Sequence, residues 1–289
     1  MQSGTAINVA QTVVQLLEDD PCFNAGRGSV LNAIGECSLD ASIMDGSDLS
    51  CGAIANVRQS KNPIALARAV LDHSEHVLLC GPEADLFGIN LGLPVESPEY
   101  FKTPEQTENW NIWKNEEKLN PEQPNPPQLK KEQLDGQSSR DLPDNRLLYL
   151  GTVGCVVRDI HGNLAAATST GGLLGKKFGR VGDSPIIGAG TYANNKTCAV
   201  SCTGIGEIFI KHHVASAISA RIEYLKETLS QACQYVIRET LPKNSGGVIA
   251  VNSNGLMELV FNTPVMSRGQ ANSEGLFRVG LDEWLFQND

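Results

Sequence analysis

Residues 151–157 read G-T-V-G-C-V-V, and residues 164–172 read L-A-A-A-T-S-T-G-G. Between them lies D-I-H-G-N at 159–163, a run of turn-forming residues. Two short, mostly apolar runs joined by such a turn predict an antiparallel hairpin buried on both faces. Glycines and hydroxyls flank both predicted strands, and glycine lets substrate or backbone approach closely because it has no Cβ. Hydroxyl-rich glycine loops at strand ends are typical of acyl-transfer sites.

Apolar spacing predicts further elements on both sides of this hairpin. Helical spacing covers 5–19, 63–71 and 207–241, and the last of these is expected to be two helices broken near Leu229–Ser230. Strands are predicted at 39–43, 51–57, 247–252, 256–261 and 276–281. Strands on both sides of long helices indicate a layered α+β architecture.

Composition excludes several classes of function. Of 289 residues, 41% are hydrophobic, and 23 Lys+Arg against 33 Asp+Glu give a net charge of −10, which disfavours nucleic acid and anionic membranes as partners. No basic leader followed by an apolar run precedes the first helix, so we expect an unanchored, cytoplasmic protein. The eight cysteines form no C-x-x-C pair and predict free thiols, neither a disulfide framework nor a zinc site.

One segment differs from the rest of the chain. Residues 102–147 hold 6 of the 14 prolines and show little apolar periodicity, so they predict a mobile linker. Trp110 and Trp113 are the candidates for docking its beginning.

Several common catalytic motifs are missing. The sequence has no G-x-x-x-x-G-K-[ST] phosphate loop and no G-x-S-x-G elbow, and its five histidines lie outside the glycine-rich clusters. A Ser-His-Asp triad is therefore not supported, and a hydrolase of this composition needs a base other than histidine.

Seven motifs in order resemble the N-terminal-nucleophile hydrolases of the plant-type asparaginase and isoaspartyl peptidase family. From Thr152, the residues Thr170, Arg180, Asp183 and Thr203 lie 18, 28, 31 and 51 positions further on, as in that family. The motifs are L-L-E-D-D-P-C-F-N-A-G-R-G-S, L-D-A-S-I-M-D-G, K-N-P-I-A-L-A-R, G-T-V-G-C-V-V, A-A-A-T-S-T-G-G, G-R-V-G-D-S-P-I-I-G-A-G-T-Y-A and S-C-T-G-I-G-E.

The resemblance implies one domain over 1–289, folded as a four-layer αββα sandwich. It further implies that the chain cleaves itself between Gly151 and Thr152, giving an α subunit 1–151 that includes the 102–147 linker, and a β subunit 152–289. A threonine hydroxyl is a weak nucleophile, and the freed α-amine, with a pKa of roughly 7.7–8.0, is a base on the same residue. Cleavage would therefore create the catalyst.

The resemblance also implies roles for individual residues. Thr152 is the expected nucleophile, Thr170 orients it, and Asn24 approaches it from the α subunit. Arg180 and Asp183 are expected to bind the α-carboxylate and α-ammonium of asparagine or a β-aspartyl dipeptide, with Gly206 lining the pocket. Thr203 and Gly204 are expected to form the oxyanion hole.

The implied partners are small molecules and a second αβ unit. No cofactor is expected, and the only implied metal is a structural Na⁺ held by carbonyls of the Leu17–Arg27 loop. Its expected ligands come from Leu17, Glu18, Asp20, Phe23, Ala25 and Arg27.

Plainer interpretations exist for each residue. Gly151–Thr152 and Asn24 fit turns, and Arg180 with Asp183 fits a surface ion pair. Thr170 and Thr203 fit a strand end and a helix cap.

Two alternatives to the expected function also remain open. Glycosylasparagine hydrolysis is the runner-up, although T-S-T-G-G in place of T-S-T-N-G favours the asparaginase branch. Family members usually begin with an earlier strand that ends in H-G-G-A-G, whereas this sequence begins within the helix that follows it. The second alternative is therefore an uncleaved, inactive isoform.

Overall fold

The computed structural model describes residues 4–119 and 151–287, so residues 120–147 of the predicted linker lie outside it. A five-stranded sheet has the order β3-β2-β1-β5-β4. Its strands are β1 (Leu39–Asp45), β2 (Cys51–Val57), β3 (Leu78–Cys80), β4 (Val153–Arg158) and β5 (Leu164–Thr170).

The second sheet has four strands in the order β6-β7-β8-β9. They are β6 (Thr191–Ala193), β7 (Cys198–Gly204), β8 (Gly246–Asn252) and β9 (Met257–Phe261). A third, smaller sheet consists of β10 (Arg268–Ala271), β11 (Phe277–Gly280) and β12 (Trp284–Gln287).

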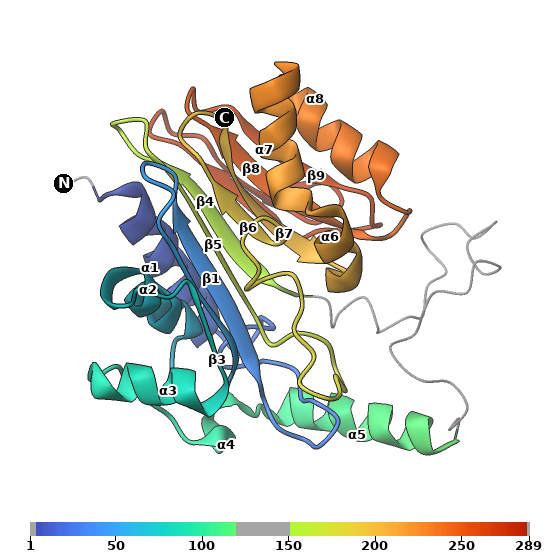
Figure 1. The fold of residues 1–289 in the computed structure, drawn as a ribbon. Coiled ribbons are helices and arrows are strands. Elements are labelled where there is room, and N and C mark those ends of the chain that lie inside the picture. Colours follow the sequence, from blue (N-terminus) through green and yellow to red (C-terminus); the bar gives the residue numbers. More distant parts are fainter. Residues whose placement is uncertain (1–3, 120–150, 288–289) are drawn as a thin grey trace.

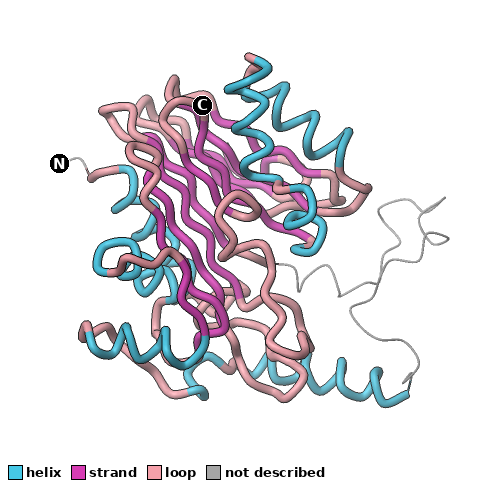
Figure 2. The backbone as a smooth tube through the Cα atoms, in the orientation of Figure 1, coloured by secondary structure: helices cyan, strands magenta, loops and turns pink. Residues whose placement is uncertain are grey.

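The two larger sheets stack on each other with helices on their outer faces (Figure 1). Helices α1 (Ala6–Asp19), α2 (Pro63–His73) and α3 (Gly81–Asn90) pack on the five-stranded sheet, while α7 (Val214–Leu225) and α8 (Leu229–Gln234) pack on the four-stranded sheet. Figure 2 shows the strands in the centre of the molecule and helices to either side. The expected αββα sandwich is confirmed.

The predicted hairpin lies in the five-stranded sheet and packs against the four-stranded one. Strands β4 and β5 pair antiparallel, with Gly154 opposite Thr168. Every residue of β5 is buried, as expected, but most of β4 is only half-buried because β4 lies at the edge of its sheet. Along β5, Ala165 and Ala167 join the core under the helices, whereas Leu164 and Ala166 join the core between the sheets. The alternation therefore directs Thr168 and Thr170 toward the space between the sheets.

The expectation of a single break in the 207–241 region is corrected. The 207–241 region is broken twice, because His213 and Lys226 adopt left-handed backbone angles, which separate α6 (Gly206–His212), α7 and α8. Thr228 then starts α8 with a capping box to Gln231, and a π-helical turn, Tyr235–Thr240, follows.

The first part of the segment 102–147 is helical. Residues 104–119 form α5 (Pro104–Leu119), and the short helix α4 (Pro98–Phe101) directly precedes the segment. The Trp110 indole N–H donates to the Asn32 carbonyl at 2.8 Å, and Trp113 is buried against Gly175, where a side chain would collide with the indole. The two aromatic side chains thus supply the anchoring that the apolar periodicity of this segment lacks.

Glu18, near the end of α1, is an ionisable group in the core. Its side chain is 1% exposed, and Oε1 accepts a hydrogen bond from the Ile64 N–H at the start of α2 at 2.9 Å. Burial raises the pKa of Glu18 to about 8. The folded protein therefore holds this carboxyl protonated at neutral pH.

We expect Glu18→Gln to stabilise the protein increasingly as the pH rises. The unfolded carboxyl ionises above its ordinary pKa of 4.5, but the folded one does so only near 8. Wild-type unfolding thus releases a proton between these values, and its free energy of unfolding falls by up to about 1.4 kcal/mol per pH unit. Glutamine keeps the acceptor for Ile64 and removes this loss. Thermal unfolding at pH 5 and pH 8 measures it, and equal Tm differences at both pH values would contradict the assignment.

Candidate active site

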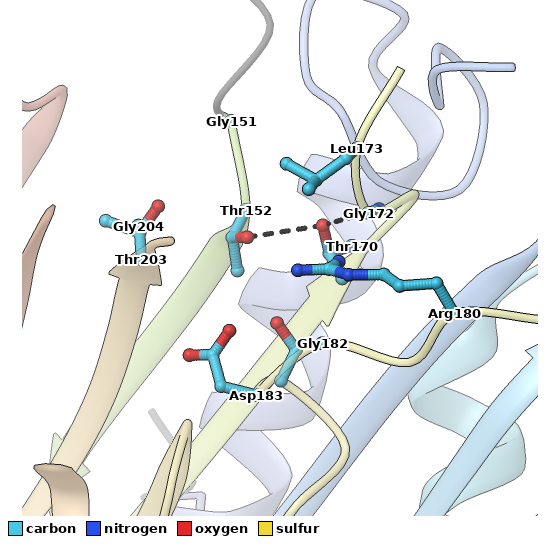
Figure 3. A pocket seen from close by; sticks show the side chains of 11 residues that line it. Gly151, Thr152, Thr170, Gly172, Leu173, Arg180, Gly182, Asp183, Thr203 and Gly204 are labelled. Carbon is cyan, nitrogen blue, oxygen red and sulfur yellow. Dashed lines mark hydrogen bonds between the residues drawn. The ribbon is translucent and has the colours of Figure 1, made fainter. Parts of the chain in front are cut away.

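The sequence-predicted residues meet at one end of the space between the two sheets. Thr152 directly precedes β4, Thr170 ends β5, and Thr203 lies at the end of β7. One pocket is lined by these three residues together with Gly151, with Gly204 at the end of β7, and with residues of the loop that follows β5 (Figure 3). The lining comprises Gly151, Thr152, Thr170, Gly172, Leu173, Arg180, Gly182, Asp183, Ser184, Thr203 and Gly204.

Thr152 and Thr170 form a hydroxyl pair. The Thr152 Oγ1 donates to Thr170 Oγ1 at 3.2 Å, and Thr170 Oγ1 also accepts from the Gly172 N–H at 3.0 Å. Thr170 thus satisfies a strand-end backbone group and contacts Thr152 at the same time, so both interpretations of this residue hold. The hydrogen bond from Gly172 fixes the position of the oxygen that Thr152 contacts.

Asn24 lies against the predicted cleavage point. Its side-chain amide donates to the Gly172 carbonyl at 2.8 Å, and its Oδ1 accepts from the Val30 N–H at 3.0 Å. A Cβ on Gly151 would lie 3.4 Å from the Cβ of Asn24. Asn24 therefore connects the loop after α1, the loop after β5 and Gly151.

Arg180 is held by a residue to which the sequence motifs gave no role. Its Nε and Nη2 donate to the two carboxylate oxygens of Glu207 at 2.8 and 3.0 Å, and these hydrogen bonds lower the pKa of Glu207. A guanidinium has a second, end-on edge formed by its two terminal nitrogens. In Figure 3 the guanidinium end of Arg180 points toward Thr152. Glu207 therefore orients Arg180 while the end-on edge faces the pocket.

Asp183 is a carboxyl group with little access to water. It is 5% exposed, and its Oδ2 has no hydrogen-bond partner within the described ranges. Burial raises the pKa of Asp183 to about 7, although the nearby Arg180 guanidinium acts in the opposite direction. An unpartnered buried carboxyl costs free energy, and a cationic group in the pocket would offset that cost. Because Asp183 is buried, the interpretation of Arg180 and Asp183 as a surface ion pair does not hold.

Gly206 does not line the pocket as expected but lies behind its two charged residues, whereas Gly204 is part of the lining. A Cβ on Gly206 would lie 2.7 Å from Arg180 Nη2 and 3.0 Å from Asp183 Oδ1, so any side chain there would displace the two charged groups. Gly204 has a φ of +150° and packs against the Ser245 carbonyl, a position that favours glycine. The residue that caps α6 is Ile205, so Thr203 is a strand residue and not a helix cap.

Two negative findings apply to the part of the chain that the structure describes. No three His, Cys, Asp or Glu side chains there cluster closely enough to hold a metal ion. No helix there combines the length and apolar character that a membrane span requires.

Comparison with known proteins agrees with this geometry. The chain matches the asparaginase family over residues 1–281. It is 42% identical over 284 residues to the isoaspartyl peptidase of Salmonella typhimurium, and the alignment covers 95% of this chain and 85% of that protein. It is 40% identical over 285 residues to a probable isoaspartyl peptidase/L-asparaginase of Arabidopsis thaliana, covering 96% and 86%. A third relative, the isoaspartyl peptidase/L-asparaginase of Rattus norvegicus, is 43% identical over 256 residues, covering 87% and 69%. The chain therefore belongs to the asparaginase family of N-terminal-nucleophile hydrolases.

Proposed function

We propose that this protein cleaves itself between Gly151 and Thr152 and then hydrolyses L-asparagine and β-aspartyl dipeptides. The observation that supports this most strongly is the meeting of the Thr152–Thr170 hydroxyl pair with Arg180 and the buried Asp183 in one pocket. A carboxylate-binding cation beside a buried carboxyl with one unpartnered oxygen is complementary to the α-carboxylate and α-ammonium of an aspartyl group. The relatives named above are isoaspartyl peptidases and asparaginases.

Self-cleavage would be an acyl shift. The Thr152 hydroxyl oxygen attacks the Gly151 carbonyl carbon, the hydroxyl proton passes to the departing nitrogen, and the C–N bond breaks. The nitrogen becomes the α-amine of Thr152 while Gly151 is held as an ester. Water then hydrolyses the ester and frees the hydroxyl. The products are an α subunit ending at Gly151 and a β subunit beginning at Thr152, as the family resemblance implies.

Turnover would reuse the same hydroxyl. The α-amine of Thr152 takes the hydroxyl proton, and the oxygen attacks the side-chain carbonyl carbon of the substrate. The Thr203 hydroxyl and the Gly204 N–H stabilise the oxyanion, and loss of one such donor costs on the order of 10²–10³ in rate. The amine then protonates the departing ammonia or amino acid, and water releases aspartate from the acyl-enzyme.

A structural Na⁺ in the loop after α1 is a further part of the proposal. Of the expected ligands, only the Phe23 carbonyl oxygen lies beside Gly28, 2.8 Å from the place where a Cβ would stand, together with the carbonyl oxygen of Pro21 at 2.4 Å, which was not among them. The Glu18 and Asp20 carbonyls accept backbone hydrogen bonds from Arg27 and Phe23. Carbonyl oxygens are the ligands that hard cations prefer. Such an ion would stabilise the loop that carries Asn24 and would take no part in the chemistry. We also propose that two αβ units form a dimer and that the protein is cytoplasmic.

The assay follows from the pocket. We expect the purified protein to release ammonia from L-asparagine and aspartate from β-aspartyl dipeptides, and to act poorly on glycosylasparagine. Activity on glycosylasparagine alone would favour the glycosylasparaginase alternative. An uncleaved chain inactive on all three substrates would favour the inactive-isoform alternative.

Substrate affinity should fall in mildly acidic solution. Asp183 binds an ammonium only when ionised, and burial raises its pKa to about 7. As the pH falls below 7, the neutral form accumulates and kcat/KM should decline, approaching tenfold per pH unit. The pH profile of kcat/KM measures this. Asp183→Asn should make that limb less steep and leave only the part due to the Thr152 α-amine, and a limb of unchanged steepness in the variant would assign it to another group.

A further inference from the structure

A chain of buried hydroxyls crosses between the two sheets below the active site. It comprises one residue each of β1, β5, β6 and β7, none more than 4% exposed. Neighbouring oxygens lie 2.7 Å apart for Ser201–Thr168, 2.6 Å for Thr168–Thr191 and 2.7 Å for Thr191–Ser42. The chain ends where Ser42 Oγ donates to the Ser184 carbonyl at 2.6 Å. Ser184 directly follows Asp183, so the chain joins both sheets to the segment that carries the buried carboxyl.

The hydroxyl chain lies one side-chain row beneath the reacting groups. Thr168 precedes Thr170 by two residues on β5, and Ser201 precedes Thr203 by two residues on β7. Residues two apart in a strand share a face, so each pair faces the same space between the sheets. The hydrogen bond between Thr168 and Ser201 therefore constrains the relative positions of Thr170 and Thr203.

Strand β4 makes room for this contact. Gly154 follows Thr152 by two residues, and a Cβ on Gly154 would lie 2.0 Å from the Ser201 hydroxyl oxygen and 2.9 Å from its Cβ. The backbone of β4, the strand that directly follows Thr152, therefore packs on Ser201 of the hydroxyl chain with no side chain between them.

The next row into the molecule is apolar, and its buried residues are Met44, Leu164, Ala166, Ala193, Ala199 and Val251. If packing were the only requirement, apolar side chains could also fill the row that holds the four hydroxyls. Buried hydroxyls are costly unless paired, so a paired row fixes one arrangement where apolar side chains would tolerate several.

Thr191 lies at the centre of the hydroxyl chain. Its Oγ1 lies 2.6 Å from Thr168 Oγ1, 2.7 Å from Ser42 Oγ and 3.3 Å from the Ser184 carbonyl oxygen. Each hydroxyl has one proton to donate, so these contacts share the protons of the chain. Loss of the Thr191 hydroxyl therefore removes the contacts that connect Ser201 and Thr168 to Ser42 and to the Ser184 carbonyl.

We propose that Ser42, Thr168, Thr191 and Ser201 are positioning residues that set the Asp183–Ser184 segment relative to Thr152, and so fix the ammonium-binding side of the pocket. This inference rests on the proposed function. None of the four side chains lines the pocket, so they act through the residues that do.

Thr191 is the position at which to test this role. Thr191→Val keeps the shape and removes the hydroxyl, whereas Thr191→Ser keeps the hydroxyl. We expect Thr191→Val to raise KM for a β-aspartyl dipeptide about tenfold while kcat changes less than about threefold, because Ser42 and the Ser184 carbonyl, on the binding side, lose their contacts with the Thr191 hydroxyl. Calorimetry should show a similar loss of affinity for the product L-aspartate. Thr191→Ser should restore both values to near the wild type.

A matched control separates positioning from stability. Thr197 and Ser219 form another buried hydroxyl pair, 2.6 Å apart, between the β6–β7 turn and α7. Thr197→Val should lower Tm as Thr191→Val does but leave KM and aspartate affinity unchanged. The inference is overturned if an active wild type and Thr191→Val share the same KM, or if Thr191→Ser or Thr197→Val raises KM as much as Thr191→Val. A wild type that neither binds L-aspartate nor turns over any substrate would overturn the proposed function itself, and this inference with it.

Discussion

Thr152→Ala is expected to abolish both self-cleavage and turnover, leaving one chain of 31.0 kDa. The same oxygen attacks the Gly151 carbonyl in the first reaction and the substrate carbonyl in the second, and alanine has no oxygen to replace it. Loss of a nucleophile in a hydrolase lowers kcat by on the order of 10⁴-fold or more. Denaturing electrophoresis and ammonia release from L-asparagine measure the two effects.

Thr152→Ser is the matched control for this change. Serine keeps a hydroxyl at the same position, so the variant should still cleave itself and retain part of its activity. If Thr152→Ala still divides into two chains, or hydrolyses asparagine at more than a small fraction of the wild-type rate, Thr152 is not the nucleophile.

Asp183→Asn should cause the second-largest loss, and the loss should be confined to substrates with an α-ammonium. Asparagine has nearly the shape of aspartate but carries no charge, so the ammonium would lose its ionic partner in a buried site. A charge-assisted buried pair that loses one member costs about 3–5 kcal/mol, which corresponds to a rise in KM of at least about 10²-fold.

Succinamate provides the control for Asp183→Asn, because it is asparagine without the α-amino group. The wild type should prefer asparagine strongly, and the variant should lose most of this preference. Steady-state kinetics with both amides measure the ratio of kcat/KM. A variant that still prefers asparagine as strongly as the wild type would show that Asp183 does not receive the ammonium.

The central fold was predictable where its signals are local. The β4–β5 hairpin has two apolar runs and a turn within twenty residues, and helix α2 has Pro63 at its start. Strand β7 mixes small and polar residues in C-A-V-S-C-T-G, which resembles a loop until β8 pairs with it. Helix α5 is polar along most of its length, and its anchors at Asn32 and Gly175 are distant in sequence. Such long-range contacts leave no periodic signal in the sequence.

The site shows the same division. The motif residues Thr152, Thr170, Arg180, Asp183 and Thr203 come together as the resemblance implied. Glu207 lay within a matched motif, but its pairing with Arg180, 27 residues away, is visible only in the fold. Ser42 and Ser184 are 142 residues apart, and a lone serine in a strand carries no signal of its partner.

N-terminal sequencing of the purified protein shows whether Thr152 becomes an N-terminal residue. We predict two chains, one of which begins Thr-Val-Gly-Cys-Val, because hydrolysis between Gly151 and Thr152 creates the α-amine on which catalysis depends. A single intact chain that nevertheless hydrolyses asparagine, or a second chain that begins at any residue other than Thr152, would contradict it.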